Sequence, residues 1–310
     1  MKRAIITGAT GAVGTALVKE LVANHVEVLI FCREGSKRNQ NILKHPLVNL
    51  KYCSLEQFST VINDTEKTYD VFFHFAWEGT TGSARDDVYL QNRNVQYALD
   101  AVEVAKRFGC RKFIGAGSQA EYGRIEGILK PNTPAFPETG YGIAKLCAGQ
   151  MTREYAHQLG LEHNWVRILS IYGPNDGDQS MVMSTIKKLQ KKEVPQFTKG
   201  EQMWDYLYSG DAARAFRLIG EKGIDGKTYV LGSGQARPLT EFIREIKDVV
   251  DSKGIIELGK LPYGEKQVMF LQADITDLKK DIQFCPQMQF KNGIRQIVEN
   301  RLDDEFSFEL

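Results

Sequence analysis

The segment RAIITGATGAVGTALVKELVAN, residues 3–24, decides the fold. It opens with the short apolar run RAIIT and continues through a glycine-rich turn. It ends in a stretch where Val13, Leu17 and Leu21 recur at helical spacing. A buried strand, a glycine loop and an amphipathic helix in this order are the opening of a βαβ unit.

The glycine loop reads TGATGAVG, residues 7–14, with a glycine at every third position. Glycine lets the backbone approach a pyrophosphate closely, and the following helix N-terminus offers free N–H groups and a positive dipole end. A purely structural tight turn is the alternative, but the place between strand and helix favours dinucleotide binding. We expect the cofactor to contact the loop residues Thr7, Gly8, Thr10, Gly11, Ala12, Val13 and Gly14.

Strand-like and helical stretches alternate through the first half of the chain. The further strand candidates are residues 26–32, 48–53, 70–76, 111–117 and 163–169, and the later helical stretches are about 91–109 and 142–159. Apolar strands separated by amphipathic helices predict a parallel sheet covered on both faces, with right-handed crossovers. The predicted fold class is α/β: a doubly wound parallel Rossmann sheet with a smaller C-terminal α/β substrate lobe.

The second half of the chain has a looser pattern. Strand-like pieces lie at residues 204–209 and 227–232, and a helix is expected near 239–251, with Thr240 as its N-cap. No linker separates the two halves. We therefore predict a dinucleotide-binding domain over residues 1–170, to which 204–233 returns, and a smaller substrate-binding lobe over 171–310.

Composition and charge exclude several classes of partner. The chain has 310 residues, with 40 Lys plus Arg against 39 Asp plus Glu, which argues against nucleic acid or an anionic membrane. No apolar run approaches the roughly 18 residues of a membrane span. The five cysteines and five histidines form no CxxC or HExxH pattern. We expect no metal site, and a reduced protein in the cytoplasm.

The end of the second strand bears on the choice of cofactor. NAD-binding sheets commonly place an acidic residue there to hold the adenosine ribose. Here Cys32 is followed by Arg33, with Lys37 and Arg38 close behind. A guanidinium can pair with a 2′-phosphate, so the pattern favours NADP(H), although NAD(H) stays possible and a solvated basic loop is the plain alternative.

A tyrosine and a lysine are spaced for acid–base chemistry. Tyr141 and Lys145, in YGIAK, stand four residues apart and share one helix face. A nearby ammonium favours the phenolate, so we expect Lys145 to lower the pKa of Tyr141. Ser118 ends a predicted strand, where ligands of α/β sheets bind. The three residues predict proton transfer to a substrate carbonyl that the Ser118 hydroxyl holds.

With these motifs the sequence resembles the extended short-chain dehydrogenases/reductases, in the NAD-dependent epimerase/dehydratase family that acts on nucleotide sugars. The motifs that carry the resemblance are TGATGAVG, NV (94–95), SQAEYG (118–123), YGIAK (141–145), VR…IYGP (166–174), WDYLYSGD (204–211) and YVLGSG (229–234). The resemblance implies a seven-stranded sheet, a nucleotide-sugar lobe and a homodimer formed through the helices at 91–109 and 142–159.

The resemblance also implies roles for individual residues. Beyond the loop and Arg33, the cofactor would contact Ala76, Asn94, Tyr141 and Lys145. The substrate would contact Ser118, Gln119, Tyr141, Ser170 and Trp204. Ser170 and Trp204 stand where the family commonly has Asn and Arg.

One departure from the family separates its branches. Its dehydratases carry an Asp–Glu pair directly after the catalytic hydroxyl residue. Here those places hold Gln119 and Ala120, and Glu121 comes one place later. Without an acid to protonate the leaving hydroxyl, dehydration is not expected.

The motifs predict an NADPH-dependent reductase of a 4-keto-6-deoxyhexose carried on CDP or dTDP. SQAEYG together with WDYLYS is similar to the branch of CDP-abequose and CDP-paratose synthases. In this hypothesis Tyr141 donates the proton, Ser118 orients the carbonyl, and Lys145 tunes Tyr141 and holds the nicotinamide ribose. Two alternatives stay open: an epimerase that retains NAD+, and a dinucleotide-sensing regulator without turnover. The Tyr–Lys pair argues for chemistry.

Overall fold

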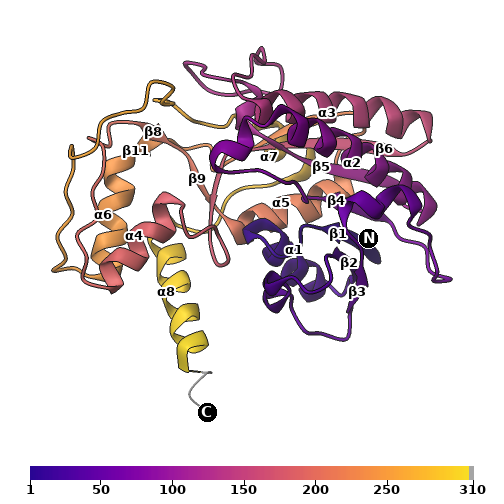
Figure 1. Cartoon of the computed structure of the whole chain (residues 1–310), viewed down its shortest axis with the longest axis horizontal. Coiled ribbons are helices and arrows are strands. Elements are labelled where there is room, and N and C mark those ends of the chain that lie inside the picture. The colour runs from indigo at the N-terminus through magenta and orange to yellow at the C-terminus, as the bar shows by residue number, and fades with distance from the viewer. Residues whose placement is uncertain (307–310) are drawn as a thin grey trace.

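The computed structural model describes residues 1–306, with side chains described up to residue 299. Its centre is a seven-stranded parallel sheet with the strand order β10-β6-β5-β4-β1-β2-β3 (Figure 1). The strands are β1 Arg3–Thr7, β2 Glu27–Cys32, β3 Val48–Tyr52, β4 Val71–His74, β5 Lys112–Ser118, β6 Glu162–Ile168 and β10 Thr228–Leu231. The strand order reverses between the neighbouring strands β1 and β4, and ligands of doubly wound sheets bind at this point.

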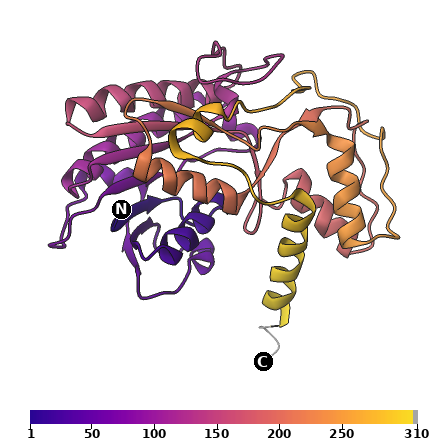
Figure 2. The same cartoon turned by 180° about the vertical axis from the view of Figure 1, so that it is seen from behind.

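Helices cover both faces of this sheet. On one face lie α1 (Ala12–Ala23), α5 (Ser209–Lys222) and α7 (Thr276–Ile282); on the other lie α2 (Val88–Arg107) and α3 (Gly140–Gln158) (Figures 1 and 2). Alternation along β1 explains why both faces need cover: Ala4 and Ile6 join the core under α1, and Ile5 joins the core under α2. All three side chains are fully buried.

The smaller lobe lies at one end of the sheet (Figure 2). Its helices are α4 (Met181–Gln190), α6 (Leu239–Val250) and α8 (Phe290–Phe306). Two short pairings connect it: β7 (Ser170–Tyr172) with β9 (Tyr206–Tyr208), and β8 (Met203–Trp204) with β11 (Arg237–Pro238). Apolar faces of all three helices meet in one separate core. Among the described residues, four 3₁₀ turns complete the elements: η1 (Lys37–Asn41), η2 (Leu55–Thr60), η3 (Gly82–Arg85) and η4 (Gln119–Glu121).

The fold class predicted from the sequence is confirmed: a parallel Rossmann-type sheet with a smaller C-terminal region. Of the segment 204–233, β10 joins the main sheet, whereas β8 and β9 pair in the small sheets. The exact division at residues 170 and 171 stays a prediction. No helix in the described part of the chain carries an apolar stretch that could cross a membrane.

The predicted N-cap of α6 is wrong. The helix begins at Leu239 with Pro238 as its N-cap, and no side chain caps it. Thr240 lies inside the first turn, where its N–H donates to the carbonyl of Gly200 at 3.0 Å. Tertiary pairing of β11 with β8, invisible in a local pattern, sets the start of the helix.

Candidate active site

Hydrogen bonds connect the carboxyl ends of β1 and β4, the neighbouring strands between which the strand order reverses. The Ala76 N–H donates to Thr7 Oγ1 at 3.2 Å. Thr7 Oγ1 and Nδ1 of His74 lie 3.0 Å apart. These contacts place the glycine loop directly beside the segment that follows β4.

Two glycines of the loop have no room for a side chain. Gly8 has φ +71°, and a Cβ there would lie 2.7 Å from the Ala76 nitrogen and 2.8 Å from the Phe75 carbonyl carbon. A Cβ at Gly14 would lie 2.2 Å from the Gly8 oxygen. Helix α1 has Gly11 as its N-cap and no capping side chain, so its first N–H groups are left for a ligand. The loop is therefore built for close approach of an anion.

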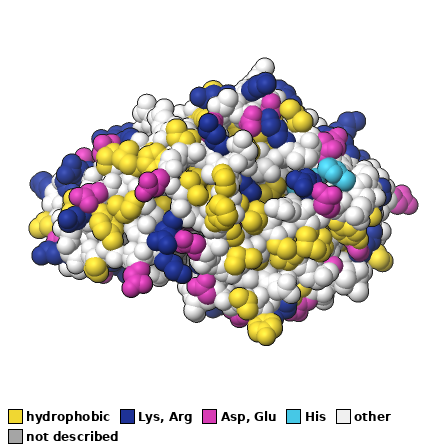
Figure 3. Space-filling view, turned by 90° about the horizontal axis from the view of Figure 1, so that it is seen from above, with side chains coloured by type: hydrophobic (Ala, Val, Ile, Leu, Met, Phe, Trp, Pro, Cys, Tyr) yellow, Lys and Arg dark blue, Asp and Glu magenta, His cyan; other side chains and the backbone are white. Residues whose placement is uncertain are grey.

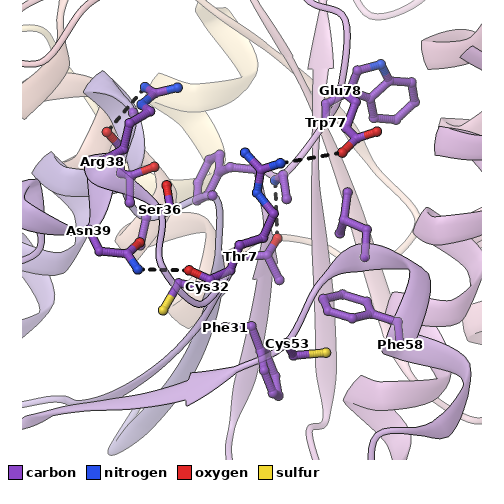
Figure 4. Close-up of a pocket in the computed structure, with 18 of the residues that line it drawn as sticks. Thr7, Phe31, Cys32, Ser36, Arg38, Asn39, Cys53, Phe58, Trp77 and Glu78 are labelled. Atoms are coloured by element: carbon purple, nitrogen blue, oxygen red, sulfur yellow. Dashed lines mark hydrogen bonds and ion pairs between the residues drawn. The ribbon is translucent and has the colours of Figure 1, made fainter. Parts of the chain in front are cut away.

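A cavity of about 280 Å³ opens beside this loop (Figure 4). Of the predicted cofactor residues, those that line it are Thr7, Gly8, Thr10, Gly11, Arg33 and Ala76. Its apolar end, which the sequence analysis missed, is formed by Phe31, Cys53, Leu55 and Phe58. A flat aromatic base suits such an end. The capping box of η2, Ser54 with Gln57, is the sequence signal that could have located the Leu55–Phe58 segment.

The opposite wall of the cavity is polar and basic (Figure 4). Arg38 donates to the Thr10 carbonyl at 3.3 Å, and the Asn39 amide donates to the Arg33 carbonyl at 2.9 Å. Asn39 Oδ1 is buried and accepts no hydrogen bond from the described residues. Arg33 lies 4.0 Å from the Glu78 carboxylate, with 69% of its side chain exposed, so this ion pair is weak. Cavity and loop together fit the adenosine and pyrophosphate of a dinucleotide.

The other predicted cofactor residues lie around this cavity rather than in its lining. Buried Asn94 accepts from the Glu78 N–H and donates to the Glu78 carbonyl, each at 2.9 Å, and so shapes the segment after β4. Ala12 and Val13 form the first turn of α1, and Gly14 packs beneath Gly8.

A tryptophan sets the distance between β5 and α3. The indole of Trp165, on β6, fills a slot whose walls are glycines. A Cβ would come within 2.1 Å of this indole at Gly115, within 2.3 Å at Gly117 and within 2.7 Å at Gly149. Because these three positions lack side chains, the N-terminal half of α3 lies close to the end of β5. This slot was not predicted from the sequence.

Lys145 is buried between α3 and β5. Its ammonium donates to the Ala116 carbonyl at 2.7 Å and lies 3.7 Å from the centre of the Trp77 ring. Burial lowers the pKa of Lys145 to about 7, against the opposing attraction of Glu121. The group therefore changes charge near neutral pH.

Tyr141 lies in the same cluster as Ser118, but its acidity departs from the expectation. Burial raises the pKa of Tyr141, while a hydrogen bond with Ser118 and the charge of Arg85 act in the opposite direction. Lys145 Nζ lies 5.8 Å from the ring centre and donates to the Ala116 carbonyl, so the lowering of this pKa by Lys145 stays a prediction. Arg85 was not among the predicted site residues.

Glu121, one place beyond the position of a dehydratase acid, is committed to the interior. It is fully buried and accepts hydrogen bonds from the Ser118 N–H at 2.8 Å, Trp165 Nε1 at 2.9 Å and Arg167 Nε at 2.7 Å. These bonds hold Ser118 at the end of β5. The Glu121 carboxylate therefore holds the Ser118 backbone in place, and its charge is paired with Arg167.

The predicted substrate residues divide into two groups. Gln119 follows Ser118 in η4 and is partly exposed. Ser170 and Trp204 come together in the small sheets, where Trp204 Nε1 donates to Ser170 Oγ at 2.8 Å. These two polar groups are each other's partners, and the Trp204 ring packs between the main core and that of the smaller lobe.

Neither a metal cluster nor a reactive thiol is found in this region of the described chain. No group of three or more His, Cys, Asp or Glu among the described residues could hold a metal ion. The cysteines are free, and burial raises the pKa of Cys53, at the cavity, to about 11. A thiol that stays protonated at neutral pH is a poor nucleophile.

Comparison with known proteins extends over nearly the whole chain. A CDP-abequose synthase of Salmonella typhimurium (strain LT2) is 24% identical over 304 residues, covering 95% of this chain and 97% of that protein. An uncharacterized UDP-glucose epimerase of Bacillus subtilis (strain 168) is 24% identical over 303 residues, with 94% and 95% covered.

Solved structures share the fold at similar sequence distance. A UDP-N-acetylglucosamine 4-epimerase of Methanobrevibacter ruminantium M1 superposes with a TM-score of 0.86 at 22% identity, covering 98% of this chain and 99% of that one. A UDP-glucose 4-epimerase of Thermotoga maritima reaches 0.84 at 21% identity, with the same coverage. The profile of the NAD dependent epimerase/dehydratase family matches residues 4–232. The strand–glycine loop–helix opening, the Ser–Tyr–Lys cluster and this match together show that the chain belongs to the NAD dependent epimerase/dehydratase family.

Proposed function

We propose that the protein is an NADPH-dependent reductase of a nucleotide-activated 4-keto-6-deoxyhexose, with CDP or dTDP as the nucleotide. The observation that carries the proposal is the basic wall of the cofactor cavity, where Arg33 follows Cys32 at the end of β2 and Arg38 lies close by. The likeness to a CDP-abequose synthase supports the substrate class. We place the reaction in the cytoplasm, where the free cysteines stay reduced.

The residues of the site have distinct tasks in this reaction. Bound NADPH supplies the hydride. The glycine loop and the α1 N-terminus bind its pyrophosphate. Ser118 holds the substrate carbonyl oxygen by its hydroxyl, and Tyr141 donates its phenolic proton to the same oxygen. Because burial raises the pKa of Tyr141, the phenol is protonated at neutral pH, which suits an acid.

The positions of two further residues, Lys145 and Glu121, complete the proposal. Lys145 lies buried within the same cluster, where its ammonium can hold the cofactor's ribose. Glu121 is engaged by three hydrogen bonds behind Ser118 and supplies no acid for a leaving hydroxyl. We therefore infer that the substrate arrives as a ready-made ketone, without a dehydration step on this protein.

Arg33→Ala tests the cofactor preference. We expect NADPH binding to weaken by about 1–3 kcal/mol, the range for a lost charge-assisted hydrogen bond, with little change for NADH. Lys37→Ala is the matched control, because it removes the same charge from η1 at a residue outside the cavity lining. Dissociation constants for both cofactors are measured by fluorescence titration. An equal loss for NADPH and NADH would show that Arg33 does not recognise the 2′-phosphate.

The stoichiometry of turnover tests the reaction itself. Purified protein is mixed with NADPH and either CDP- or dTDP-4-keto-6-deoxyglucose, and both nucleotides are followed by chromatography and mass spectrometry. We expect one NADPH oxidised per ketone consumed, and little NAD+ retained through purification. A reductase must exchange its cofactor in every turnover, so these two results belong together.

An epimerase that retains NAD+ is the second candidate. Its support is the structural likeness to epimerases, with TM-scores of 0.86 and 0.84. An epimerase takes a hydride from its sugar and returns it, so it keeps oxidised cofactor bound at rest. Stoichiometric NAD+ in the purified protein, with sugar interconversion that needs no NADPH, would establish this candidate. A regulator without turnover would bind the dinucleotide and leave both the CDP-sugar and the dTDP-sugar unchanged.

We also propose a homodimer formed through α2 and α3. On the outer side of α3, Ile143 and Met151 are 55% and 45% exposed, and exposed Cys147 lies between them at helical spacing. Figure 3 looks onto the side of the molecule where these helices lie and shows hydrophobic side chains gathered there. Sedimentation velocity should give the mass of two chains, and Ile143→Arg with Met151→Arg should give one. A wild-type protein of single-chain mass would contradict the proposal.

A further inference from the structure

Arg85 lies against the proposed proton donor. It is the last residue of η3, in the segment that connects β4 to α2. Its guanidinium carbon lies 4.4 Å from the centre of the Tyr141 ring. Nη1 of Arg85 donates to the Thr80 carbonyl at 2.9 Å, which anchors the side chain. A Cβ at Gly140 would lie 3.1 Å from the Arg85 oxygen, so the η3 backbone lies close to the start of α3.

Four charged or hydroxyl groups face Tyr141, each from a different element. Ser118 approaches from β5, Arg85 from η3, Glu121 from η4 and Lys145 from α3 itself. The two cations differ in distance from the ring centre: 4.4 Å for Arg85 and 5.8 Å for Lys145. Lys145 is also directed to a backbone carbonyl.

The negative charge in this group is already paired. The Glu121 carboxylate forms an ion pair with the Arg167 guanidinium at 2.7 Å and is fully buried. It raises the pKa of Tyr141, whereas Arg85 lowers it. Arg85 is therefore the charge that is placed to offset both this carboxylate and the cost of burying a phenolate.

We propose that Arg85 is a positioning residue for proton transfer, which holds the Tyr141 ring by a cation–π contact and stabilises the phenolate left when the proton has gone. The proton moves from the Tyr141 hydroxyl to the substrate oxygen, and the electron pair of the broken O–H bond stays on the phenol oxygen. A guanidinium over the ring attracts that charge more strongly than it attracts the neutral phenol. This inference rests on the proposed role of Tyr141.

A titration that needs no turnover tests the inference. Tyr141 is replaced by 3,5-difluorotyrosine, whose phenol ionises at lower pH than tyrosine, and its ionisation is followed by ¹⁹F NMR. In Arg85→Gln the transition should move to higher pH by about one unit or more, the size expected for loss of an opposite charge at this distance. Arg85→Lys should restore much of the shift, because the charge is retained.

Arg93→Gln is the matched control. Arg93 is an exposed arginine of α2 whose guanidinium acts on a different buried tyrosine, Tyr97. Its loss removes the same charge and should leave the transition at position 141 unchanged. A shift of equal size in Arg93→Gln would show a general effect of net charge and would overturn the inference.

Kinetics separate this role from its rivals. In Arg85→Gln we expect a lower kcat for ketone reduction, while KM for NADPH stays unchanged. The alkaline limb of the pH profile should move to higher pH, by the same amount as the NMR transition. An unchanged NMR transition overturns the proposal. Arg85 would then only brace the loop at Thr80 or, if Arg85→Gln raises KM for the ketone, contact an anionic group of the substrate. A shifted transition in a protein that reduces no ketone would support the inference and reject the proposed reaction.

Discussion

Tyr141→Phe is expected to lower the rate of ketone reduction by about 10²–10⁴-fold while NADPH binding survives. The substitution removes the proton donor and keeps the ring. That ring still fits edge-on to Trp77, at 6.2 Å between centroids, and beneath Arg85, at 4.4 Å. Single-turnover rates with saturating NADPH measure the loss, because they exclude product release.

Tyr229→Phe is the control for removing a buried hydroxyl. Tyr229 is fully buried on β10 of the same sheet, and its hydroxyl lies 3.1 Å from the Asp281 carboxylate. Loss of this bond to a charged carboxylate, and of the one that the hydroxyl accepts from the Ile224 N–H, should lower stability by about 1.5–3 kcal/mol and leave the rate unaltered. If Tyr141→Phe retained near-normal turnover, Tyr141 would have no part in the proton transfer.

Lys145→Met should damage both cofactor binding and rate. Losing hydrogen bonds from an ammonium to the ribose costs about 1.5–3 kcal/mol, or about 10- to 150-fold in affinity. Methionine is similar in length and suits a buried position, so the fold should survive. Retention of full NADPH affinity by a well-folded Lys145→Met protein would exclude Lys145 from the cofactor site.

The pKa of Lys145 adds a dependence on pH to this prediction. Burial lowers that pKa to about 7, so above pH 7 the Lys145 side chain of the free protein is mostly the neutral amine. A bound anionic cofactor favours the charged form, so binding at pH 8 should take up a proton, and affinity should fall from pH 6 to pH 9. Calorimetry in buffers of different ionisation enthalpy measures the uptake. It should vanish in Lys145→Met, and its absence from the wild type would contradict the assignment.

Most strands of the main sheet could be predicted from local sequence patterns. The apolar runs that predict β1, β2, β4, β5 and β6 are long enough, and buried on both faces, to be recognised without knowledge of their neighbours. The glycine loop could be identified because Gly8 and Gly14 leave no space for a Cβ, a requirement that constrains residue type at fixed spacing. The positions of Ser118, Tyr141 and Lys145 could also be predicted locally, because Ser118 ends a strand and the other two residues share one turn of a helix.

Contacts between segments far apart in sequence decided the rest. Trp204 and Ser170 are 34 residues apart, and the hydrogen bond between them depends on how the small sheets fold. Glu121 and Arg167, 46 residues apart, form a buried ion pair that fixes the charge behind Ser118.

By itself, the sequence determined the opening strand–loop–helix unit, and it placed Ser118 at a strand end and Tyr141 and Lys145 on one helix turn, because each follows from local spacing. Only the tertiary structure decided what surrounds Tyr141. Arg85 reaches it from the segment after β4, and Lys145 is drawn to the carbonyl of Ala116. The acidity of a buried phenol is the sum of desolvation and all nearby charges, and those are set by packing rather than by any one stretch of chain.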